Sequence, residues 1–172
     1  GMIYLDACIL IYALEDRGAR GDTVRAALRE TTGVVASSSL ALHECLVGPL
    51  RRRDPEVRDR YLALFDRVET IELGAAAFIR AAELRADFGL RTPDALHLAA
   101  AQLAGCTELW TNDRRLATAS RGLAIDVIGD IVRSNWAGSH IILGRRRHER
   151  TSGFIHIPLD LRDRYGLAVL AI

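Results

Sequence analysis

Short apolar segments alternate with longer amphipathic ones along most of the chain. The apolar segments are too short for helices and predict buried strands at residues 3–5, 34–36, 70–73, 109–111 and 125–128. Between them, apolar positions recur at helical spacing and predict helices at residues 8–14, 23–30, 40–47, 55–67, 75–87, 92–103 and 115–120. Strands that alternate with helices favour a parallel sheet covered on both faces. We therefore predict a three-layer α/β/α fold with a central parallel sheet.

Residues that begin or end helices support several of these boundaries. Asp54 stands before Pro55, an arrangement in which the aspartate caps a helix and the proline takes its first position. Gly89 is suited to the left-handed position that ends a helix. The pair Gly48-Pro49 is predicted to end the helix that precedes it.

The pattern changes after about residue 132, so we predict a domain over residues 2–132 and a C-terminal extension over 133–172. The extension has features of a β-rich segment, and its apolar last residues need a partner surface. Its segment FIHIPLDLRDRYGL, at residues 154–167, resembles half of an AbrB-type swapped hairpin, a DNA-binding fold that supplies many antitoxins. The alternatives are a packing extension and translation through a former stop codon.

The amino-acid composition excludes some reaction mechanisms, whereas the net charge of the chain excludes none. The 172 residues are 49% apolar and 26% charged, which is ordinary for a globular protein, and the net charge is only +1. No run approaches the roughly 20 apolar residues of a membrane-spanning helix. Three widely spaced cysteines, Cys8, Cys45 and Cys106, indicate free thiols in a reducing cytoplasm. All 23 basic residues are arginine, which excludes mechanisms that need a catalytic lysine.

Four carboxylates fall where a parallel sheet presents its chemistry. Asp6 and Asp113 each follow a predicted strand directly. Asp94 lies in the first turn of a predicted helix, and Glu44 lies in a mostly apolar one. Because ligands bind outside the carboxyl ends of such strands, we expect these side chains to converge there. Converging acids repel one another unless cations neutralise them, and a site of a few carboxylates suits Mg²⁺ or Mn²⁺.

Each acid also has a structural explanation. Asp94 beside Pro93 is a common acid at a helix start, Asp113 is suited to cap the next helix, and Glu44 is compatible with a solvent-facing position. Asp6 is the hardest to explain structurally, because an acid rarely closes an apolar strand. Taken together, the four acids favour a metal site that activates a water for attack on a phosphodiester.

Two sets of basic residues lie near these acids in the sequence. His97 is three residues after Asp94, on the same helix face, where it would tune that carboxylate, contact substrate or simply be a hydrogen-bonded buried histidine. Arg51, Arg52 and Arg53 follow Glu44 by about two turns and are suited to holding RNA phosphates, although solvated surface is the usual role of a charge run.

Four segments resemble, in order and spacing, the motifs of PIN domains of the VapC toxin type. They are MIYLDACILIY at residues 2–12, SLALHE at 39–44, TPDALHLAAA at 92–101 and LWTNDRRL at 109–116. The resemblance, over residues 2–131, implies divalent-metal-dependent RNA cleavage, a homodimer and often a cognate antitoxin. It makes Asp6, Glu44, Asp94 and Asp113 the metal-binding acids, with Thr111 and Asn112 as supporting polar residues. The family often has a residue that helps the site just after the first acid, a role we do not expect of Cys8.

Other classes whose first strand ends in aspartate need residues that this chain lacks. An aspartyl-phosphate phosphatase needs an acid where Cys8 stands, a phospho-receiver domain needs a lysine, and a dinucleotide-binding domain needs a glycine-rich turn after its first strand. A non-catalytic PIN-like binding or scaffold module remains as the alternative. We predict a cytoplasmic Mg²⁺- or Mn²⁺-dependent endoribonuclease, the toxin of a toxin–antitoxin pair, that cleaves single-stranded or looped RNA.

Overall fold

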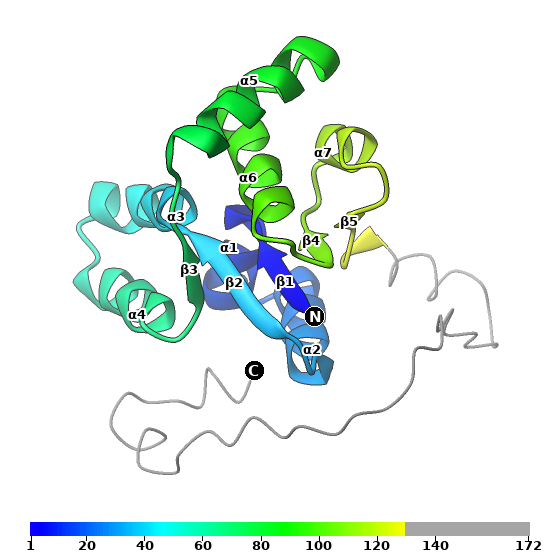
Figure 1. Cartoon of the computed structure of the whole chain (residues 1–172). Helices are drawn as coiled ribbons and strands as arrows, with labels where there is room; N and C mark the ends of the chain where they lie inside the picture. The colour runs from blue at the N-terminus through cyan, green and yellow to red at the C-terminus, as the bar shows by residue number, and fades with distance from the viewer. Residues whose placement is uncertain (130–172) are drawn as a thin grey trace, which may run out of the picture.

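The computed structural model of the chain describes residues 1–129, so the predicted extension, with its segment at 154–167, lies outside the described residues. Five strands form one parallel sheet in the order β3-β2-β1-β4-β5 (Figure 1). The strands are β1 (Met2–Leu5), β2 (Val34–Ser38), β3 (Glu69–Ile71), β4 (Glu108–Trp110) and β5 (Ala124–Ile125). The helices are α1 (Ala7–Glu15), α2 (Ala19–Glu30), α3 (Ser39–Arg52), α4 (Pro55–Phe65), α5 (Ala75–Phe88), α6 (Thr92–Leu103) and α7 (Arg114–Ala119).

Alternation along the central strands divides the interior into two cores, one on each face of the sheet. Ile3 and Leu5 of β1 belong to a core shared with α1, α3 and α4, whereas Tyr4 belongs to a core shared with α5, α6 and α7. In β4, Leu109 and Trp110 divide between the two cores in the same way. Successive strand residues point to opposite faces, so this division requires a sheet covered by helices on both sides. The predicted three-layer α/β/α fold is therefore confirmed.

Two of the predicted helix boundaries follow from local chemistry that the structure shows directly. The Asp54 side chain accepts a hydrogen bond from the backbone N–H of Val57 at 3.1 Å and caps α4, whose first residue is Pro55. Gly89 ends α5 in the left-handed region, with a φ of 66°. Both boundaries are confirmed.

The predicted end of the third helix at Gly48-Pro49 is wrong, because α3 continues through both residues to Arg52. A proline inside a helix removes one backbone donor. Here Pro49 is buried, and its carbonyl still accepts a hydrogen bond from the N–H of Asp54 at 2.9 Å. Packing of α3 against α4 keeps this last turn in place. The helix ends instead at Arg53, which has a φ of 55°.

The second helix begins at Ala19, ahead of its predicted start at residue 23. Gly21 therefore lies inside α2, where it is buried against the carbonyl of Asp16. Any Cβ at Gly21 would collide with that carbonyl, so this glycine permits a close approach rather than interrupting the helix.

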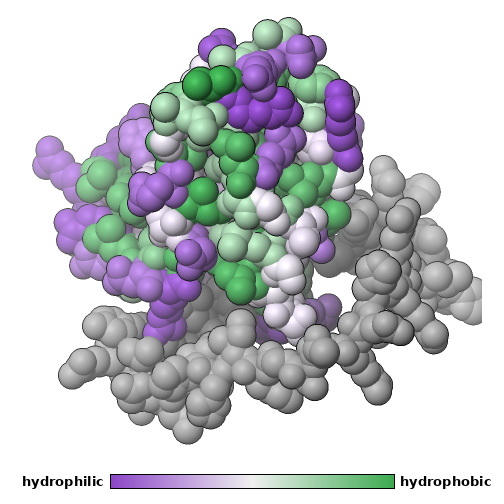
Figure 2. Space-filling model, in the orientation of Figure 1, coloured by the Kyte–Doolittle hydropathy of each residue, from purple (hydrophilic) through white to green (hydrophobic). Residues whose placement is uncertain are grey.

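The exposed face of α5 is more apolar than an amphipathic pattern suggests. Ala77, Ala81 and Leu84 are buried, whereas Phe78 is 53% exposed and Ile79 64% exposed. Figure 2 shows hydrophobic residues on the surface over α5, at the top of the view. None of the helices within residues 1–129 has the length and apolar character needed to cross a membrane.

Candidate metal centre

Asp6 lies at the carboxyl end of β1 and is held there by both neighbouring chain segments. Its backbone N–H donates to the carbonyl of Trp110 at 3.0 Å, which extends the pairing of β1 with β4. The Thr111 hydroxyl donates to Asp6 Oδ2 at 2.7 Å. Asp6 is only 8% exposed, so these donors offset part of the cost of burying its charge. Thr111 therefore has the supporting position expected of it.

Cys8 contacts Asp6 only weakly, and the expectation that it gives the site no help stays a prediction. Its Sγ lies 3.6 Å from Asp6 Oδ2 and is oriented to donate. Burial, followed by the charge of Asp6, raises the pKa of Cys8 to about 12, so the thiol keeps its proton. The contact is a weak S–H donor to the carboxylate.

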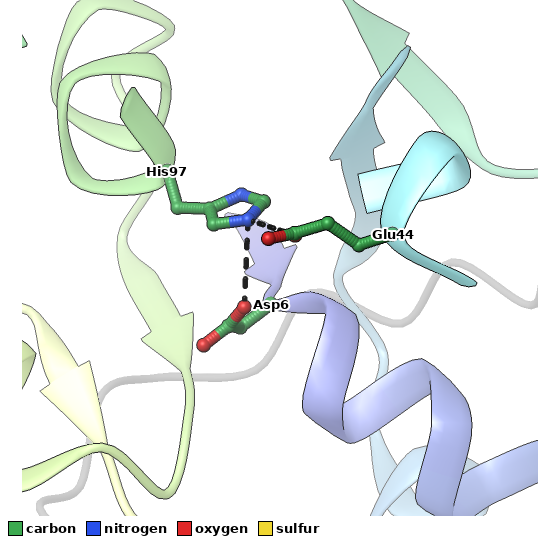
Figure 3. Close-up of side chains that lie close together, drawn as sticks. All are labelled: Asp6, Glu44 and His97. Atoms are coloured by element: carbon green, nitrogen blue, oxygen red, sulfur yellow. Dashed lines mark hydrogen bonds and ion pairs between the residues drawn. The ribbon is translucent and has the colours of Figure 1, made fainter. Parts of the chain in front are cut away.

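Glu44 and His97 reach Asp6 from two different helices (Figure 3). His97 Nε2, on α6, lies 2.6 Å from Glu44 Oε2 on α3 and 3.6 Å from Asp6 Oδ1. One ligand atom from each of these three side chains falls within 4.8 Å of the other two. Glu44 thus directs its carboxylate toward His97 and Asp6, while its side chain stays 30% exposed. Three groups from three separate parts of the chain meet at one point, which is the arrangement of a metal-binding cluster.

A buried chain of hydrogen bonds fixes His97 from behind. Tyr4 Oη lies 2.8 Å from His97 Nδ1 and 2.7 Å from Ser38 Oγ. Ser38 in turn accepts from the backbone N–H of Ala41 and caps α3, the helix that carries Glu44. The network begins and ends on α3, so it couples the position of that helix to the orientation of the imidazole.

The environment of His97 favours its protonated form. Burial lowers the pKa of His97, but the hydrogen bond to Glu44 and the charges of Asp6 and Glu44 outweigh it, so the pKa stands above its ordinary value. A proton on Nε2 lies between two carboxylates and neutralises part of their charge. His97 therefore orients Glu44 and limits its repulsion from Asp6.

Asp94 and Asp113 form a second group around Arg91. Arg91 Nε contacts Asp94 Oδ2 at 2.9 Å, and Arg91 Nη2 lies 3.9 Å from Asp113 Oδ2. Asp94 is in the first turn of α6 and is 9% exposed. Asp113 also caps α7, because its Oδ1 accepts from the Arg115 N–H at 2.8 Å. The capping role anticipated for Asp113 is thus confirmed, and its other oxygen still faces Arg91.

The two groups are electrostatically adjacent. The hydrogen bond to Glu44 is the main cause that raises the pKa of His97, and the charge of Asp94 adds to it. The hydrogen bond to Asp94 is the main cause that raises the pKa of Arg91, and the charges of Asp113 and Glu44 add to it. Thr111 links the groups directly, because its Oγ1 donates to Asp6 and accepts from the backbone N–H of Asp113 at 3.1 Å. The four acids named from the sequence therefore surround one end of the sheet, in two groups.

The recorded side-chain contacts of the remaining named residues are with groups other than the four acids. Asn112 Nδ2 donates to the Tyr12 hydroxyl at 3.3 Å. Arg52 forms an ion pair with Glu15 at 2.7 Å, and Arg51 and Arg53 are exposed near the end of α3. None of these contacts bears on RNA binding, which stays a prediction for the three arginines.

The donor set fits a divalent metal ion of the Mg²⁺ or Mn²⁺ type. Carboxylate oxygens predominate, and they come from the end of β1, from inside α3, from the first turn of α6 and from the N-cap of α7. Sequence reasoning missed Arg91, although its place three residues before Asp94 on one helix face was a usable signal. It also missed Tyr4 and Ser38, since a tyrosine inside an apolar strand looks like an ordinary core residue.

Comparison with known proteins agrees with this geometry. The family model described as PIN domain matches residues 3–122. A solved toxin–antitoxin complex from Klebsiella pneumoniae is 24% identical, with a TM-score of 0.62 over 73% of this chain and 97% of that one. Mycobacterium tuberculosis VapC20, described as a sarcin-ricin loop cleaving toxin, is 19% identical, with a TM-score of 0.60 over 68% and 94%. At these identities the solved structures show a shared fold.

A second family matches the other end of the chain. The model of a Na⁺/H⁺ ion antiporter subunit matches residues 94–172, overlapping the first match. A Rhizobium meliloti (strain 1021) protein, named as a probable subunit of a K⁺/H⁺ antiporter, is 44% identical over 50 residues, which are 29% of this chain and 31% of that protein. The match thus spans about a third of that relative, and the predicted extension at 133–172 lies wholly within the family match.

Proposed function

The chain belongs to the PIN domain family, and from this membership and the geometry of its site we propose that it is a divalent-metal-dependent endoribonuclease. The observation that carries the proposal is the meeting of Asp6, Glu44 and His97 at the carboxyl end of the parallel sheet. The Asp6 and Glu44 carboxylates repel each other and His97 neutralises only part of their charge, so a divalent cation bound between them would be stabilising.

Each residue has a distinct part in this proposal. Asp6, Glu44, Asp94 and Asp113 hold the metal ion. Mg²⁺ or Mn²⁺, when bound, supplies an activated water and neutralises charge on the phosphodiester and its leaving oxygen. Thr111 fixes Asp6 through its 2.7 Å hydrogen bond, and His97 with Tyr4 fixes the Glu44 carboxylate. The chain therefore needs no protein nucleophile.

The biological part of the proposal is that the chain is the toxin of a toxin–antitoxin pair. One solved structure of this fold is described as a toxin–antitoxin complex and another as a toxin, which supports an antitoxin partner here. RNA as the substrate, a homodimer and a cytoplasmic location belong to the same proposal. Single-stranded or looped RNA is the better substrate, because splayed strands bring a phosphodiester into a crevice more easily than a duplex.

The test is cleavage of a mixed RNA pool by the purified chain with Mn²⁺, Mg²⁺ or EDTA. Asp6→Asn and Asp94→Asn should abolish cleavage while circular dichroism stays unchanged. Asp59→Asn is a matched control, because Asp59 is an exposed acid paired with Arg58 on the outer surface of α4. Cleavage that persists in EDTA, or in Asp6→Asn, contradicts the proposed mechanism.

The alternative is a non-catalytic PIN-like binding module. Titration calorimetry with Mn²⁺ separates the two functions if no RNA in the pool is cut. A nuclease with a narrow target binds Mn²⁺ through Asp6 and loses that binding in Asp6→Asn. A scaffold has no need to bind the ion at all.

A further inference from the structure

Arg91 is the one residue at the site whose position the proposed reaction does not explain. It stands at the N-cap of α6 but makes no capping hydrogen bond with its side chain. Instead, its guanidinium lies between two proposed metal ligands, 2.9 Å from Asp94 Oδ2 and 3.9 Å from Asp113 Oδ2. The same oxygens would face a bound metal ion.

We propose that Arg91 is an exchangeable cation, which holds Asp94 and Asp113 together when the metal is absent and is displaced when the metal binds. The inference rests on the proposed function, because it takes Asp94 and Asp113 to be ligands. Under this proposal the affinity of the site for its metal is set partly by a residue of the chain that competes with the ion.

Exposure makes the exchange feasible. The Arg91 side chain is 69% exposed, against 12% for Asp94 and 27% for Asp113. An exposed arginine forms weak ion pairs that water and salt compete with, so it leaves at low cost. The less exposed carboxylates stay in place and keep the geometry of the site.

The inner half of the site offers a contrast. His97 is 1% exposed, and its second ring nitrogen is held by Tyr4, so it has no comparable freedom to leave. Arg91 has solvent beside it and a long flexible side chain. The exchange is therefore assigned to the rim of the site and not to its buried part.

Mn²⁺ binding to the full, EDTA-treated chain tests the proposal. Titration calorimetry and the paramagnetic resonance signal of free Mn²⁺ both report affinity without any cleavage assay. Arg91→Gln should bind Mn²⁺ roughly two- to fivefold more tightly than the parent, because the competing ion pairs are gone. The ratio should fall toward one at high salt, where exposed pairs are already screened. Arg91→Lys, with a single ammonium in place of the forked guanidinium, should lie between the two.

Arg80→Gln is a matched control. Arg80 pairs with Glu83 at 2.8 Å with the same i,i+3 spacing as Arg91 and Asp94, but on α5. It also donates to Gln102 at 3.0 Å, at the opposite end of α6 from Asp94. Its loss removes the same charge and should leave Mn²⁺ affinity unchanged. An Arg91→Gln chain that binds Mn²⁺ as the parent does, or more weakly, overturns the inference. If neither the parent nor the Arg91→Gln variant binds Mn²⁺ although both are folded, the inference and the proposed function are both overturned.

Discussion

Replacing Tyr4 with phenylalanine tests whether the buried network orients the metal ligands. Tyr4 is 0% exposed, and its ring fills the core between β1 and α6. The substitution keeps the ring and removes only the hydroxyl, which contacts His97 Nδ1 at 2.8 Å and Ser38 Oγ at 2.7 Å. The change in packing is therefore small, and the effect is confined to hydrogen bonding.

The size of the stability loss follows from the groups left without partners. His97 Nδ1 becomes a buried polar atom with no partner from Tyr4, which costs about 1–3 kcal/mol. Ser38 loses less, because its oxygen still accepts from the N–H of Ala41. We expect the free energy of unfolding to fall by about 2–3 kcal/mol in total. Urea denaturation followed by circular dichroism measures this loss.

The functional effect should exceed what lost stability explains. Partners that orient metal ligands from behind typically contribute about 10- to 100-fold in metal affinity. Without the Tyr4 hydroxyl, His97 is held only through its contacts with Glu44 and Asp6, so the Glu44 carboxylate is positioned less firmly. Tyr4→Phe should therefore bind Mn²⁺ about tenfold or more weakly, measured by calorimetry on fully folded protein.

Tyr61→Phe is the control that separates orientation from stability. Tyr61 is also 0% exposed, and its hydroxyl donates to Glu15 at 2.7 Å on the α4 side of the molecule. This variant should lose stability and keep its Mn²⁺ affinity. If Tyr4→Phe keeps the parent affinity, or if both variants lose affinity equally, the network does not orient the site.

Three further predictions concern the whole domain. Burial raises the pKa of Cys45 above its ordinary 9.0 and that of Tyr61 above 10.0, so the unfolded chain loses these protons first. The free energy of unfolding should therefore be constant below about pH 9. It should fall by about 1.4 kcal/mol per pH unit for Cys45 above about pH 9, and by the same amount for Tyr61 above about pH 10. An unchanged urea midpoint at higher pH contradicts this. Removing residues 133–172 should leave the circular dichroism of the domain and RNA cleavage intact, and loss of either shows that the extension is part of the enzyme. EDTA should leave the domain folded. Mn²⁺ at about 100 times its Kd should raise the free energy of unfolding by about 2.7 kcal/mol, which is measured as a higher melting temperature. An EDTA-treated chain that is unfolded refutes this prediction.

The sequence located Asp6 and Asp113 at one edge of the sheet because chain topology places them there. Asp6 and Asp113 follow strands whose partners are parallel, and parallel strands carry such residues to the same edge of the sheet. Capping rules placed the start of α4 for a similar reason, since Asp54 acts on its immediate neighbours. Predictions succeeded where the determining contacts were local or followed from strand order.

Predictions failed where side chains from distant elements decided the outcome. The turn signal at Gly48-Pro49 was overridden because α3 packs on α4.

The contacts of the four acids explain how this domain can fold before its metal arrives. Thr111 and His97 satisfy Asp6 and Glu44 in the interior, and Arg91 spans Asp94 and Asp113 at the rim. Small metal-dependent domains fold only with the ion, because their ligands are otherwise unpaired and their cores are small. Here two cores on opposite faces of the sheet stabilise the fold, and the chain's own donors neutralise the ligands. In the proposed exchange, metal binding replaces Arg91, the most exposed of these donors. The free energy of metal binding is then not needed for the chain to fold.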